Sequence, residues 1–124
     1  MEQKFYRCAH CGNIIAKVHD SKVPVMCCGE VMQEIIPNTV DASNEKHIPE
    51  YTLNNNMVTV NVGSVTHPMS EEHYIEWISI QTNYGNQRKC LAPTSAPTAQ
   101  FALLDGEQIE AVFAYCNLHG LWKK

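Results

Sequence analysis

The chain has 124 residues, of which 44% are hydrophobic and 18% are charged, and its formal net charge is −4. This composition predicts a folded core and excludes intrinsic disorder. The negative charge gives no support for a binder of nucleic acid or of a membrane surface, and no apolar run approaches the roughly 20 residues of a membrane span.

The six cysteines predict metal ligation rather than disulfide bonds. Residues 1–7 hold no apolar stretch typical of a secretory signal, so we expect a cytoplasmic protein. Because the cytosol keeps thiols reduced, cysteine clusters there are more often metal sites than disulfide frameworks. A disulfide framework stays open as an alternative if the chain is exported by another route.

The first predicted domain, residues 1–37, is dominated by four cysteines. Cys8 and Cys11 form a C-x-x-C pair, and Cys27 and Cys28 are adjacent. Four thiolates at roughly tetrahedral corners suit iron or zinc, and the spacing leaves both metals open. Because neighbouring Cα atoms are about 3.8 Å apart, Cys27 and Cys28 can reach one ion only with local strain.

This domain also needs a metal for its stability. Short strands are predicted at residues 14–18 and 22–25, where apolar residues lie between turn signals. A unit of this size lies below the roughly 40 residues at which a hydrophobic core alone usually suffices, so we expect a structural metal. Pro37 lacks an amide donor and favours extended chain before it, which marks the linker.

The second predicted domain, residues 38–124, contains several strand candidates separated by turn signals. They are residues 57–62, 73–82, 88–91, 99–104 and 111–116. The first alternates apolar and polar residues, as a half-buried strand does, and no run of ten or more residues carries a helical stripe. This pattern predicts an all-β sandwich. Cys90 lies in the third candidate, and we expect a buried or half-buried free thiol.

A second set of possible metal ligands combines a thiol with imidazoles. Cys116 and His119 follow the last strand candidate, and the other members are His47, His67 and His73. Four neutral imidazoles and one thiolate make a five-coordinate site with one position open for a small ligand. His47 and His67 lie near prolines, where we expect extended chain. A lone histidine is more often a surface or core residue, so this interpretation depends on the whole set.

Four motifs in the same order resemble the desulfoferrodoxin family, the two-iron class of superoxide reductase. The C-x-x-C…C-C pattern falls on the four cysteines of the first domain. E-K-H-x-P falls on residues 45–49, H-P-M…H on residues 67–73, and C-N-x-H-G-L-W on residues 116–122. The resemblance covers essentially the whole chain and shows no departure at a ligand position.

This resemblance implies a fold and an activity. A small desulforedoxin-like domain with a rubredoxin-type iron would precede an immunoglobulin-like, neelaredoxin-like β-sandwich. In the sandwich, the second iron would have Cys116 as axial ligand and four histidines in a plane: His47, His67, His73 and His119. The protein would be an oxidoreductase that reduces superoxide to hydrogen peroxide with one electron and two protons. A rubredoxin-type electron donor and a homodimer are implied as well.

By the same resemblance, two charged residues beside His47 have catalytic roles. Lys46 would attract the superoxide anion, and Glu45 would supply the carboxylate that occupies the sixth position of the oxidised, resting iron. Without the motif, Lys46 and Glu45 would be interpreted as an ordinary solvated charge pair.

Three other functions remain open on the sequence. A non-catalytic, rubredoxin-like electron carrier would use the four-cysteine iron and leave the second domain as a scaffold. A zinc-stabilised binding module would have two structural sites and no colour. Superoxide dismutation would require superoxide itself to re-reduce the metal efficiently.

Overall fold

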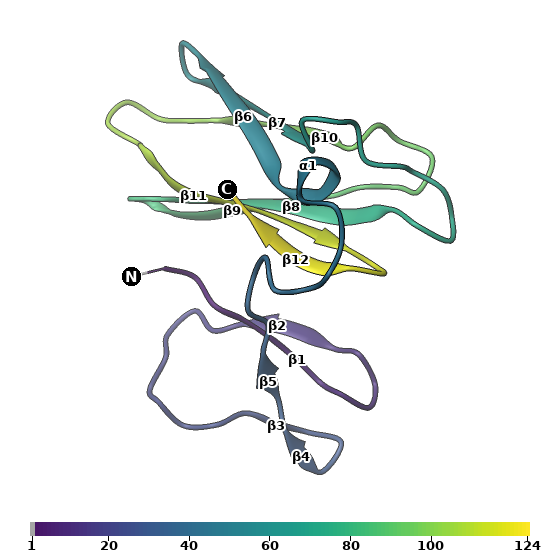
Figure 1. The fold of residues 1–124 in the computed structure, drawn as a ribbon. Coiled ribbons are helices and arrows are strands. Elements are labelled where there is room, and N and C mark those ends of the chain that lie inside the picture. Colours follow the sequence, from purple (N-terminus) through teal and green to yellow (C-terminus); the bar gives the residue numbers. More distant parts are fainter. Residues whose placement is uncertain (1) are drawn as a thin grey trace. The chain divides into compact units, whose positions relative to one another are not determined.

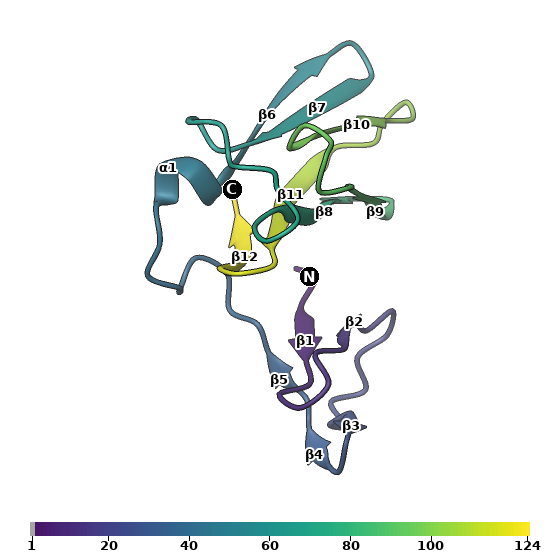
Figure 2. The same cartoon turned by 90° about the vertical axis from the view of Figure 1, so that its right-hand side faces the viewer.

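The computed structural model describes residues 2–124, and this part of the chain is built almost entirely from short β-strands (Figures 1 and 2). The predicted all-β class is therefore confirmed. The chain divides into two compact units, Met1–Ile36 and Pro37–Lys124. Among the described residues, no helix has the length and apolar character that crossing a membrane requires.

The first unit contains two small antiparallel sheets. One sheet has the order β2 (Ile14–Ala16), β1 (Phe5–Arg7), β5 (Gln33–Glu34), and the other pairs β3 (Met26–Cys27) with β4 (Glu30–Val31). Its buried apolar side chains include Phe5, Cys8 and Met32. So small a core agrees with the expectation that a bound metal contributes to the stability of this unit.

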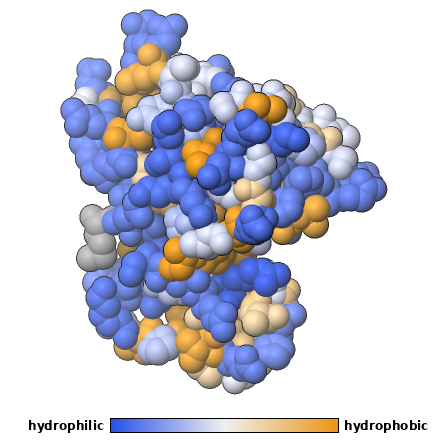
Figure 3. All heavy atoms as spheres, in the orientation of Figure 1, coloured by the Kyte–Doolittle hydropathy of each residue, from blue (hydrophilic) through white to orange (hydrophobic). Residues whose placement is uncertain are grey.

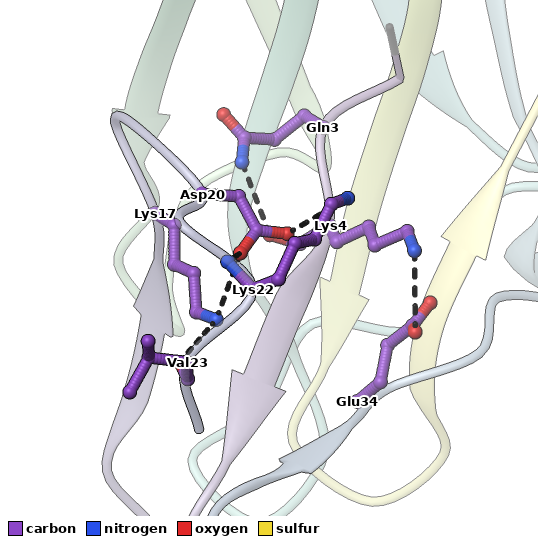
Figure 4. Close-up of polar contacts among 7 residues, drawn as sticks. All are labelled: Gln3, Lys4, Lys17, Asp20, Lys22, Val23 and Glu34. Atoms are coloured by element: carbon purple, nitrogen blue, oxygen red, sulfur yellow. Dashed lines mark hydrogen bonds and ion pairs between the residues drawn. The ribbon is translucent and has the colours of Figure 1, made fainter. Parts of the chain in front are cut away.

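Residues 22–25, predicted as a strand, instead follow a tight turn. Lys22 has a φ of 68°, in the left-handed region, which interrupts an extended chain. Asp20 Oδ1 accepts hydrogen bonds from the backbone N–H of Lys22 (2.8 Å) and from Lys17 Nζ (3.1 Å), as Figure 4 shows. These bonds favour the carboxylate and lower the pKa of Asp20 to about 2. Local side-chain bonding thus outweighs the β-propensity of the neighbouring valines.

The second unit is a sandwich of two antiparallel sheets (Figure 1). One has the order β10 (Thr98–Ala102), β7 (Met57–Val62), β6 (Pro49–Asn54), and the other the order β12 (Gly120–Lys123), β11 (Ile109–Cys116), β8 (Ile75–Thr82), β9 (Gly85–Cys90). Apolar side chains of both sheets form one buried cluster, with Val60 and Phe101 from the first and Ile78, Ile80 and Val112 from the second. This shared core is what makes the two sheets a sandwich.

A β-bulge in the second sheet adjusts which side chains face the core. Tyr115 lies opposite Trp77, but the next residue, Cys116, lies opposite Ile75, so the register shifts at Glu76. Strict alternation after Ile78 would turn Ile75 away from the core. The bulge returns it, and Ile75 and Cys116 are both fully buried in the core cluster.

Some elements were not predicted, and one prediction about burial was wrong. The strands β6 and β12 and the helical turn α1 (Asn44–His47) carry little periodicity, because β6 is a mostly exposed edge strand and the other two are four residues long. Cys90 is exposed rather than buried, since β9 is an edge strand whose side chains mostly face solvent.

Hydrophilic residues dominate the face drawn in Figure 3, with apolar ones scattered between them.

Candidate metal centres

Four cysteine thiols converge in the first unit. The Sγ atoms of Cys8, Cys11, Cys27 and Cys28 all lie within 4.8 Å of one another. The sulfurs of Cys11 and Cys27 are 3.6 Å apart, and those of Cys27 and Cys28 are 4.0 Å apart. Cys28 has a φ of 53°, in the left-handed region, so the adjacent pair reaches one point through local backbone strain.

Within this cluster, hydrogen bonds lower the pKa of one thiol and raise the pKa of another. The backbone N–H of Cys11 lies 3.4 Å from Cys8 Sγ, and with the N–H of His10 it lowers the pKa of Cys8 to about 6. The pKa of Cys28 is raised to about 12, because its thiol is hydrogen-bonded to Cys11 and Cys8. Four thiolates therefore need a cation to coexist, and the donor set fits a tetrathiolate iron or zinc centre.

Four imidazole rings form a square in the second unit. Neighbouring ring centroids lie 4.7 to 5.1 Å apart in the circular order His47, His67, His73, His119. Each ring is nearly perpendicular to the next, at 78° to 87°. The diagonal between the centroids of His47 and His73 is longer, at 6.2 Å. The four rings thus surround one point from four sides.

His47 reaches this square from a helix rather than from extended chain. It is the last residue of α1, and Ile48 after it is extended, with φ −69° and ψ 121°. The sequence prediction was wrong by one residue, because Pro49 constrains the residue immediately before it and leaves His47 free to be helical. His47 is the buried residue of α1.

His73 lies before β8 and not inside the strand predicted at residues 73–82. It belongs to a tight turn in which Ser70 N–H donates to the carbonyl oxygen of His73 (2.9 Å) and His73 N–H donates to Ser70 Oγ (3.2 Å). These bonds use the backbone groups that a strand would offer to its neighbour. The turn and His67 both belong to the connection between β7 and β8.

Backbone carbonyls orient two of the rings. His47 Nδ1 donates to the carbonyl oxygen of Ser43 (2.7 Å), and His67 Nδ1 donates to that of Pro68 (2.6 Å). The Nε2 atoms are thereby left with a free lone pair. Burial lowers the pKa of His47 and His73, and it lowers the pKa of His67 to about 4, so these imidazoles are neutral at pH 7.

The inner nitrogens and a buried thiol form one donor set. Among the described residues, the Nε2 atoms of His67 and His73 are buried without a hydrogen-bond partner. The ligand atoms of His47, His67, His73 and Cys116 lie within 4.8 Å of one another. Buried polar atoms that lack a partner are costly, and a metal ion removes that cost.

His119 completes the square with its other ring nitrogen. Its Nδ1 lies 3.1 Å from His47 Nε2 and 3.9 Å from Cys116 Sγ. Burial raises the pKa of Cys116, while the backbone N–H groups of His119 and Leu118 act in the opposite direction. A cation beside this sulfur would stabilise the thiolate. Imidazoles together with a thiolate fit a single transition-metal ion such as iron.

Two residues of the last motif support the square, and sequence reasoning assigned them no role. Trp122 is fully buried, and the centroid of its ring lies 4.8 Å from that of His47. Its Nε1 donates a hydrogen bond to the carbonyl oxygen of His119 (3.0 Å). Asn117 bonds to the segment that carries His73. Their position in the same short segment as two candidate ligands, Cys116 and His119, was the available signal.

Lys46 and Glu45 both lie exposed on α1, next to His47. Burial is the main cause of the lowered pKa of His73, and charge interactions with His119 and Lys46 act in the same direction, so the field of Lys46 acts on the square. The backbone carbonyl of Glu45 accepts hydrogen bonds from Val65 N–H (2.9 Å) and Ser64 Oγ (3.2 Å). These bonds tie α1 to the loop that leads to His67.

Known proteins are similar to this chain in sequence and fold. Residues 39–124 match the family model described as Desulfoferrodoxin. A desulfoferrodoxin from Syntrophotalea carbinolica is 44% identical over 117 residues, which cover 94% of this chain and 91% of that protein. The crystal structure of the superoxide reductase from Treponema pallidum is similar with a TM-score of 0.84 and 37% identity, covering 100% of this chain and 99% of that one. The superoxide reductase (1Fe-SOR) from Giardia intestinalis has a TM-score of 0.56 and 36% identity, covering 64% of this chain and 95% of that one.

Proposed function

Because the chain belongs to the desulfoferrodoxin family, we propose that it is an oxidoreductase that reduces superoxide to hydrogen peroxide. The observation that carries the proposal is the square of four imidazoles beside the buried thiol of Cys116. Each superoxide takes up one electron and two protons to become hydrogen peroxide. Iron bound in the square supplies the one-electron reduction.

Two donor sets hold the two irons in this proposal. The first is the four-cysteine set: Cys8, Cys11, Cys27 and Cys28. The second would combine the thiolate of Cys116 with the four imidazoles: His47, His67, His73 and His119. Hydrogen bonds to backbone carbonyls orient the rings of His47 and His67 within this donor set.

Two residues of α1 act on the substrate side of the second centre. Lys46 attracts the superoxide anion, and a local positive charge is needed for this because the whole chain carries a net charge of −4. Glu45 would supply a carboxylate to the oxidised, resting centre. Both residues are exposed on α1 next to the buried His47, and the charge of Lys46 contributes to the lowered pKa of His73, which supports these roles.

The proposal extends to domains, partners and location. Residues 1–37 are the desulforedoxin-like iron domain, and residues 38–124 are the superoxide reductase domain. A rubredoxin-type protein donates the electron, and the chain forms a homodimer. Thiolate metal sites need reduced cysteines, which favours a reducing compartment, and we place the protein in the cytoplasm on that ground.

Metal analysis together with the visible spectrum tests this function. We expect two irons per chain, the colour of a ferric tetrathiolate, and a further thiolate-to-iron band that appears on mild oxidation. The further band is expected because Cys116 is the one thiolate at the second centre. One iron per chain, or a colourless zinc protein after expression with ample iron, would contradict the reductase and favour the electron carrier or the structural module.

A further inference from the structure

The side chain of Asn117 connects two segments that carry ligands of the second centre. Asn117 lies in the turn between Cys116 and His119. Its Oδ1 accepts a hydrogen bond from Tyr74 N–H (2.9 Å), and its Nδ2 donates to the carbonyl oxygen of Glu72 (3.0 Å). These two backbone groups flank His73 on either side. The carboxamide therefore holds the His73 backbone from both directions.

This connection begins where the regular ladder ends. The last backbone pair between β11 and β8 is Cys116 with Ile75, directly after the β-bulge. Beyond it, Asn117 N–H donates to the carbonyl oxygen of Tyr74 (3.2 Å), and the carboxamide adds its two bonds. The hydrogen bonds of the His73 backbone go to Ser70, within its own turn. They shape the turn but do not tie it to the segment of Cys116 and His119.

We propose that Asn117 is a positioning residue for the second metal centre. It sets the distance between the His73 corner of the square and the two ligands that follow β11. The inference rests on the proposed function, because it takes the square to be an iron site. We call the two bonds of the Asn117 carboxamide the clamp. Without the clamp, a metal ion that binds must itself order the His73 turn, and the entropy cost of that ordering weakens metal binding.

A matched control exists in the same sandwich. Asn83 makes the same three kinds of bond: Oδ1 accepts from Gln108 N–H (2.6 Å), Nδ2 donates to the carbonyl oxygen of Gly106 (3.0 Å), and its own N–H donates to that of Gln108 (3.1 Å). It joins two turns that carry no metal ligand. Asn83→Ala therefore removes an equivalent clamp and reports the purely structural cost.

The test compares wild type, Asn117→Ala and Asn83→Ala as full-length chains. Each iron-loaded protein is challenged anaerobically with a chromogenic ferrous chelator, and the iron that remains at the second site is then read by its thiolate band after oxidation. We expect Asn117→Ala to bind iron at the second site about 10- to 100-fold more weakly, with a shifted band and an unchanged first site. Asn83→Ala should lose thermal stability to a similar degree and keep wild-type iron affinity.

Wild-type affinity and an unshifted band in Asn117→Ala would overturn the inference. If this variant does not fold, Asn117→Asp takes its place, because it keeps the acceptor for Tyr74 N–H and loses the donor to the Glu72 carbonyl. Asn117→Asp should also bind iron more weakly at the second site. Wild-type iron affinity in this variant would likewise overturn the inference. A wild-type protein without a second iron would instead contradict the proposed function.

Discussion

Cys116→Ser is expected to abolish the thiolate-to-iron band of the second centre and to slow superoxide reduction by on the order of 100-fold or more. Cys116 is fully buried among the core residues and lies in the donor set with three imidazoles. A thiolate donates far more charge to a metal than a serine oxygen, which stays protonated at neutral pH. The change is measured by the visible spectrum after oxidation and by stopped-flow kinetics with superoxide.

Two controls separate this effect from unfolding and from the first centre. A buried hydroxyl without a good partner costs about 1–3 kcal/mol, so the melting temperature of Cys116→Ser is measured beside its spectrum. Cys8→Ser should damage the tetrathiolate colour and leave the reaction with superoxide intact, since the square lies in the other unit. If Cys116→Ser kept both its band and its rate, the assignment of Cys116 as a ligand would be wrong.

Lys46→Ala is expected to lower the second-order rate constant with superoxide by about tenfold and to flatten its dependence on salt. The positive charge of Lys46 acts on the square, while the rest of the chain is net negative. Local attraction of an anion is screened within about 10 Å at 0.1 M ionic strength, so the difference between the proteins should shrink as salt rises. Stopped-flow rates over a series of salt concentrations measure both effects.

The matched variant for this prediction is Lys46→Arg. It keeps the positive charge on α1, so it should retain most of the rate and of the salt dependence. Iron content should be the same in both variants, because Lys46 is not in the donor set. An unchanged rate in Lys46→Ala would remove this lysine from the mechanism.

The sequence predicted which cysteines and histidines lie together better than it predicted the chain conformation around them. Cysteines and histidines are chemically distinctive, so spacing and motif order identified them without a fold. The backbone at two histidines was predicted incorrectly. His47 ends a helical turn, and His73 lies in a turn closed by Ser70, because local hydrogen bonds decided the conformation where no periodicity was present.

Other features depend on contacts between distant residues. The β-bulge opposite Tyr115 and Cys116 turns the side chain of Ile75 toward the core. No local sequence pattern predicts this bulge. From the sequence alone, Asn117 is interpreted as a turn residue. Only the fold brings its side chain to the backbone around His73, where it bonds to Tyr74, 43 positions earlier in the sequence. The exposure of Cys90 follows from the edge position of β9, which only the strand order reveals.

The yield of hydrogen peroxide per superoxide consumed tests the central claim most directly. Reduced protein is mixed with a known amount of superoxide, and hydrogen peroxide and dioxygen are both quantified. A reductase with the iron site proposed here forms one hydrogen peroxide for each superoxide and releases no dioxygen, while one electron is drawn from the protein or its donor. Half that yield of peroxide, with an equal amount of dioxygen, would identify dismutation and contradict the account.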